Sequence, residues 1–97
     1  MKEKWFVGVL EHDSSQKRDF CILNLRLGFR GIASSIATLA EVFSQLTGSD
    51  FKDAINYDPP KGIDGTNPRL YPGRYYPLSV KERKAFEKNF REKLAAK

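Results

Sequence analysis

The sequence predicts an α+β fold in a single domain of 97 residues. Two short runs rich in aromatic and branched residues are separated by a polar turn, which is typical of a β-hairpin. A single apolar stripe at helical spacing predicts an amphipathic helix in the middle of the chain. A capping box begins a second, charged helix. The expected elements in chain order are a hairpin at 4–27, helices at 31–47 and 50–57, an ordered arm at 58–78 and a helix at 80–96.

The hairpin pairs the runs "KWFVGVL" and "DFCILNLRL" across the turn "SSQKR". A four-residue loop over 14–17 sets Asp13 opposite Arg18 and Phe6 opposite Leu25. Opposite charges at the loop mouth favour this register. A helix over 19–27 is the competing interpretation, because periodicity alone does not distinguish a short apolar run.

Both faces of this hairpin are apolar. An antiparallel pair with one face in water should alternate between apolar and polar residues, so we expect each face to be covered. The first face is formed by Trp5, Val7, Val9, Phe20 and Ile22. The second face is formed by Phe6, Gly8, Leu10, Cys21, Leu23, Leu25 and Leu27.

The helices follow from spacing and end signals. Apolar residues recur every three or four positions from Ile32 to Leu46, and Gly48 stands where a left-handed cap is expected. Pro59 and Pro60 end the expected short helix at 50–57. The segment 58–78 holds all five prolines and several tyrosines, which predicts an ordered arm. In the last helix, Phe86, Phe90 and Leu94 form a narrow apolar edge.

Composition excludes several classes of protein. One cysteine permits no internal disulfide, and the apolar run that ends before Glu11 is too short for a signal peptide or a membrane span. We therefore expect a cytoplasmic protein with no membrane partner. The net charge is +5, and the excess lies after Tyr57. Such asymmetry suggests a basic surface for an acidic partner.

The chain is poorly equipped for catalysis. Its single histidine, His12, and single cysteine, Cys21, fall on opposite faces of the expected hairpin, beyond the hydrogen-bond reach that a nucleophile and its base require. A zinc site needs about four ligands. The acids around His12 are more simply a charged turn than a cation site. We therefore expect a protein that is not an enzyme and that has no cofactor and no metal.

The arm and the last helix suggest nucleic-acid binding. Arginine forks suit phosphates, and aromatic rings can stack on unpaired bases. Lysines along the last helix could follow a phosphate backbone. The candidate nucleic-acid-binding residues are Arg69, Arg74, Tyr75, Tyr76, Lys81, Lys84 and Lys88.

Protein interaction is the alternative. The last helix has few large apolar residues, so the first face of the hairpin could stay uncovered. An exposed apolar patch of that size marks a docking or dimerisation surface. The chain would then be an interaction module, or a small inhibitor such as a mobile element encodes, that docks on a larger protein or on a second copy of itself. The candidate interface residues are Trp5, Val7, Val9, Phe20 and Ile22.

Overall fold

The computed structural model describes residues 4–13, 15–47, 54–61 and 69–95. It confirms an α+β fold, with a mixed five-stranded sheet and two helices among these residues. The strands are β1 (Trp5–His12), β2 (Arg18–Asn24), β3 (Gly28–Ala33), β4 (Ile55–Asn56) and β5 (Gly73–Pro77). The helices are α1 (Ile36–Thr47) and α3 (Val80–Ala95).

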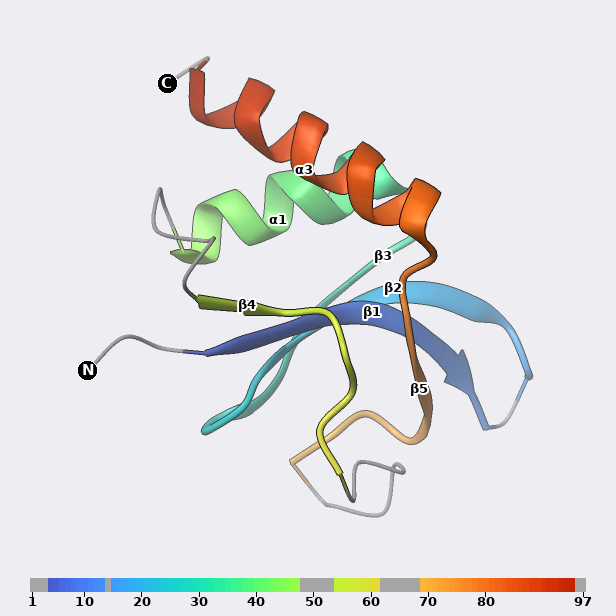
Figure 1. Ribbon diagram of the computed structural model, residues 1–97. Coiled ribbons are helices and arrows are strands. Elements are labelled where there is room, and N and C mark those ends of the chain that lie inside the picture. The colour runs from blue at the N-terminus through green and yellow to red at the C-terminus, as the bar shows by residue number, and fades with distance from the viewer. Residues whose placement is uncertain (1–3, 14, 48–53, 62–68, 96–97) are drawn as a thin grey trace.

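Strand β1 is the centre of the sheet. Its pairing partner along one edge is β2, which continues to β3. Its other edge is shared, because β4 pairs in parallel with Trp5 and Phe6 while β5 pairs antiparallel with residues 8–12. Figure 1 shows the chain rising from β5 into α3. One strand therefore joins its hairpin partner β2 to two segments that are distant in the sequence, β4 and β5.

The predicted hairpin forms, and residues 19–24 are strand rather than helix. Its register differs from the predicted one, because Phe6 pairs with Leu23 and Glu11 pairs with Arg18. The turn closes one residue earlier on both strands, with the His12 N–H donating to the Lys17 carbonyl at 2.8 Å. The pairing register therefore differs by two residues in total. Because side chains alternate with a period of two, the residues of each predicted apolar face still share one face.

Three predicted elements are wrong in part. Residues 31–33 belong to β3, so the central helix begins at Ile36 and not at residue 31. Residues 55–56 form β4 where the short helix was expected, and residues 50–53 of that helix lie outside the described residues. Residues 73–77 of the arm form β5. Tertiary pairing with β1 and β2 determines these segments, which have weak local preference of their own.

Both helices cover the first face of the sheet, as Figure 1 shows. Phe43 of α1 lies at the centre of this first core, in contact with Trp5 at a ring-centroid distance of 6.0 Å and with Phe86 and Phe90 of α3 at 5.6 and 5.4 Å. The capping box of α3 is confirmed, because Ser79 Oγ accepts from the Glu82 N–H at 3.1 Å and Glu82 Oε1 accepts from the Ser79 N–H at 2.9 Å.

The second face is covered by the returning chain instead of a helix. The second core consists of Phe6, Leu10, Cys21, Leu23 and Tyr75, with Phe29 and Leu70 packed against it. Gly28 permits this closure, because a Cβ there would lie 2.6 Å from the Arg69 carbonyl oxygen. Its φ of 99° is also a conformation that favours glycine. The prediction that both faces are covered is confirmed.

Candidate functional site

The outward face of α3 is strongly basic. Residues of a helix that differ by three or four positions share a face, and Lys81, Lys84, Lys88 and Arg91 follow that spacing. All four are exposed. The exposed residues of α3 also include one acid, Glu92. The stripe therefore presents four positive charges beside one negative charge.

The other two glutamates of α3 have partners of their own. Glu82 is held in the capping box at Ser79. Glu87 is half-buried and lies beside the Tyr57 hydroxyl, whose pKa is raised by burial and further by that carboxylate. Arg83 is also half-buried beside Tyr57, since its guanidinium carbon is 4.3 Å from the Tyr57 ring centroid. Among the described residues of α3, Glu92 is therefore the one acid that is exposed beside the stripe.

Two more arginines extend the basic surface onto the sheet. Arg74 and Arg18 flank Glu11 in one row of the sheet, on β5 and β2 respectively. Both arginines are exposed, and the Arg18 guanidinium lies 5.7 Å from the half-buried Tyr76 ring. Arg18 also lines a cavity of about 240 Å³ together with Glu82 from the first turn of α3. This row therefore adjoins the beginning of the helix.

We use the term α3 basic surface for Lys81, Lys84, Lys88, Arg91, Arg18 and Arg74. It contains four of the seven residues that the sequence suggested for nucleic-acid binding. Tyr76 borders it through its contact with Arg18. Arg91 belongs to the basic residues along the last helix, as its spacing from Lys84 and Lys88 indicates, although it was not one of the seven candidates. Arg18 could not be identified from the sequence, because its place in one row with Arg74 depends on β5.

Two predicted residues lie elsewhere. Tyr75 is 6% exposed in the second core, and its hydroxyl donates to the Tyr71 carbonyl at 2.6 Å. It cannot stack on a base while the fold is intact. Arg69 lies by the β2–β3 turn, where its Nη1 donates to the Arg26 carbonyl at 2.9 Å. The arm therefore does not present its arginines and tyrosines together, because β5 alternates its side chains between two faces.

The first face of the hairpin is not an exposed surface. Trp5, Val7, Val9 and Ile22 are at most 7% exposed, and Phe20 is half-buried. All five pack in the first core beneath the helices. The expectation that this face stays uncovered is wrong. It failed because α1 and α3 stack on the same side of the sheet, and the second face needs no helix.

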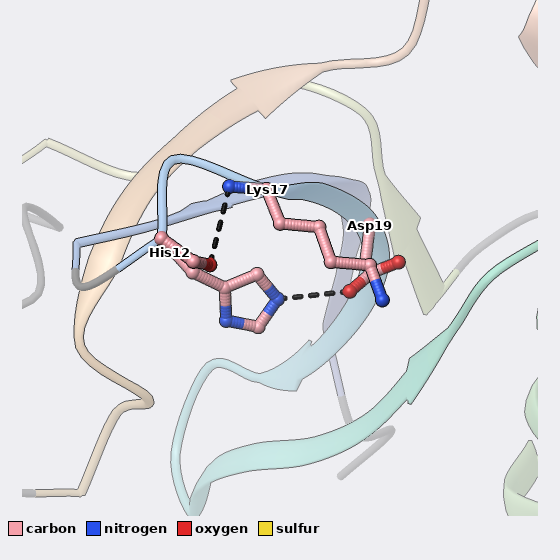
Figure 2. Close-up of polar contacts among 4 residues, drawn as sticks. His12, Lys17 and Asp19 are labelled. Carbon is pink, nitrogen blue, oxygen red and sulfur yellow. Dashed lines mark hydrogen bonds and ion pairs between the residues drawn. The ribbon is translucent and has the colours of Figure 1, made fainter.

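The prediction that Cys21 and His12 lie on opposite faces is wrong, because His12 is on the same side of β1 as Gly8, the pairing partner of Cys21. The two residues are still far apart, since His12 is four positions along β1 from Gly8, which is about 13 Å. Cys21 is fully buried in the second core, where burial raises the pKa of its thiol from 9.0 to about 12, despite a lowering contribution from the backbone of Gly8. A thiol with that pKa is a poor nucleophile at neutral pH. Figure 2 shows the His12 ring directed at the Asp19 carboxylate, with His12 Nε2 2.9 Å from Asp19 Oδ2.

The His12–Asp19 pair belongs to the packing of the hairpin end. The two residues are diagonal neighbours on adjacent strands, within reach of each other. The edge of the His12 ring meets Tyr71 at a centroid distance of 5.0 Å. The described residues contain no group of three or more His, Cys, Asp or Glu side chains placed to hold a metal ion. The pair therefore orders the turn.

No helix in the described part of the chain is long and apolar enough to cross a membrane. The chain matches no protein-family model, no curated protein and no solved structure. Functional inference must therefore begin from the geometry of the surface itself.

Proposed function

We propose that this protein is a non-enzymatic nucleic-acid-binding protein that contacts phosphates through the α3 basic surface. The observation that carries this proposal is the row of four exposed cations on α3, beside which Glu92 is the one exposed acid among the described residues of the helix.

The dimensions of the stripe suit a nucleic-acid backbone. Lys81 and Arg91 are ten residues apart, which is about 15 Å along a helix axis. Phosphates on one strand of a duplex recur at about 3.4 Å along the axis, so the stripe spans about four of them. Lysine side chains are flexible and strongly hydrated. Contacts of this kind neutralise charge and read little sequence.

The burial of Tyr75 changes the mechanism suggested by the sequence. Stacking of bases on tyrosines is reduced to Tyr76, which is itself half-buried beside Arg18. Binding therefore depends on counterion release, and we expect a duplex to bind at least as well as a single strand. A protein partner on the first hairpin face would have to displace both helices, so we do not propose that alternative.

The test is the salt dependence of binding, measured by fluorescence anisotropy with a labelled 20-base-pair duplex. Neutralising four phosphates gives a slope of log K against log salt of about −3.6. Replacing Lys84→Gln and Lys88→Gln together should make that slope shallower by about 1.8, because each lost contact contributes about 0.9. Both side chains are exposed, so the variant should remain folded.

The matched control is Lys4→Gln with Lys17→Gln, which removes the same charge from exposed positions outside α3. Its slope should equal that of the unmodified protein. An equal decrease in the steepness of the slope for the two double variants would mean that net charge alone drives binding. The α3 basic surface would then have no special role. Absence of binding at low salt would refute the proposal altogether.

A further inference from the structure

A second basic region lies on the other side of the sheet. A cavity of about 200 Å³ opens where the segment at residues 69–70 returns past the β2–β3 turn. Its wall includes Leu70, which packs against the second core, whereas both helices cover the first face. The cavity is therefore separate from the α3 basic surface.

The cavity combines an apolar wall with a cationic rim. Leu25, Pro60 and Leu70 supply the apolar wall. Lys61 and Arg69 also line the cavity, and they are the two charged residues of its described lining. This pairing of surfaces suits a small ligand that has an anionic head and an apolar body.

Two guanidinium groups are anchored to this turn. Arg69 Nη1 donates to the carbonyl of Arg26 at 2.9 Å, and Arg30 Nη2 donates to the carbonyl of the next residue, Leu27, at 3.2 Å. Of these two arginines, Arg69 lines the cavity.

The wall that carries Arg69 is fixed to the sheet. The Phe29 N–H donates to the Arg69 carbonyl at 3.0 Å, and the close approach at Gly28 leaves no space for a side chain between the turn and residue 69. Arg69 is therefore positioned before any ligand arrives, which reduces the entropy lost on binding.

We propose that this cavity binds the phosphomonoester group of a small organic molecule. The phosphate would meet Lys61 and Arg69, and the organic part would lie against Leu25, Pro60 and Leu70. A phosphomonoester carries close to two negative charges at pH 7, matching the two lining cations, and arginine forks bind phosphate bidentately. Pockets for drug-sized ligands are about 300–1,000 Å³, so this cavity admits a single small group. The same chemistry occurs in a free metabolite and at the phosphorylated end of a nucleic-acid strand.

The experiment is a titration of the ¹⁵N-labelled protein followed by amide chemical shifts. Phenyl phosphate carries both features of the ligand, while inorganic phosphate lacks the apolar body and benzyl alcohol lacks the charge. We expect phenyl phosphate to shift the amides of Asn24, Gly28 and Leu70, and to bind at least about tenfold more tightly than either fragment, because charge-assisted hydrogen bonds and apolar contact act together.

The variants locate the site. Lys61→Gln and Arg69→Gln should each weaken phenyl phosphate binding about tenfold, because each removes one charged contact. Lys61 is exposed, so its variant tests the site even if Arg69→Gln loosens the wall. The Lys84→Gln and Lys88→Gln double variant is the control and should bind phenyl phosphate normally. These results are independent of whether the α3 basic surface binds nucleic acid.

Three outcomes would overturn the proposal: no shifts at millimolar phenyl phosphate, shifts confined to α3, or equal affinity for benzyl alcohol. Equal affinity for inorganic phosphate would refute the apolar contact. A last pair of ligands distinguishes a free metabolite from the phosphorylated end of a nucleic-acid strand. Tighter binding of adenosine monophosphate than of a 5′-phosphorylated oligothymidylate indicates a free small molecule, and the reverse order indicates a strand end. Either order supports the site only when the shifts fall on the same amides.

Discussion

Replacing Trp5→Ala tests whether the first face of the hairpin is core or surface. Trp5 is 7% exposed, and its ring meets Phe43 edge to face at 6.0 Å. Removing a buried tryptophan costs about 3–5 kcal/mol, which is a large part of the roughly 5–15 kcal/mol that stabilises a typical domain. With a urea dependence of about 1–3 kcal/mol per molar, the unfolding midpoint should fall by roughly 1–5 M.

The assay is urea unfolding followed by far-ultraviolet circular dichroism, because the variant loses the only tryptophan. Val80→Ala is the control, since Val80 is 68% exposed on α3 and its truncation should change the free energy of unfolding by less than about 0.5 kcal/mol. A loss below about 1 kcal/mol for Trp5→Ala would refute the packing described here and restore Trp5 as a surface residue.

Two further predictions concern the second face. The free energy of unfolding should decrease as pH rises from about 9 toward 12, because the unfolded Cys21 thiol releases its proton near 9.0 while the folded thiol retains its proton up to about 12. In Cys21→Ala the free energy of unfolding should fall less over this pH range. If chemical unfolding gives the same pH profile for the variant and the unmodified protein, the prediction is wrong. Gly28→Ala should move residue 69 away from the turn, because the new Cβ would meet the Arg69 carbonyl at 2.6 Å. Hydrogen exchange at the Phe29 amide, which donates to that carbonyl, should accelerate, and unchanged protection would show that the close approach is not required.

The sequence predicted those parts of the fold whose signals are local. The hairpin faces, the stripe of α1 and the capping box of α3 each depend on neighbouring residues. The first and the last are confirmed, and the stripe is confirmed from Ile36 to Phe43. The side on which α3 packs was not predictable from its own pattern. Three apolar residues on a charged helix appeared too few for a core, but Phe86 and Phe90 are fully buried against Phe43.

The missed strands share a physical reason. β3 contains two glycines, which have low strand propensity, and its Ile32 happens to continue the helical spacing of α1. β4 is two residues long, and β5 ends in Pro77, which an edge position tolerates. Each exists because β1 or β2 provides hydrogen-bond partners, and such pairing is not encoded in a local pattern.

The candidate binding residues were likewise predictable only where the signal is local. Lys81, Lys84 and Lys88 follow from helical spacing and lie where the sequence placed them, on an exposed face. Arg69 and Arg74 are five positions apart in the chain, but the fold sends one to the cavity and the other to the sheet row beside Glu11. The partner of Glu82 follows from the local capping box, whereas the position of Glu87 beside Tyr57 depends on a residue distant in the sequence.

The central position of β1 also affects how the chain is made. β1 pairs along one edge with residues 55–56 and 73–77, which are synthesised much later than β1 itself. At about 5–20 residues per second, that delay is on the order of ten seconds or less. During translation the edge presents unpaired amides and carbonyls, the kind of template on which other chains assemble. Nascent chains that stop before Gly73 should therefore depend on chaperones more than the finished protein does.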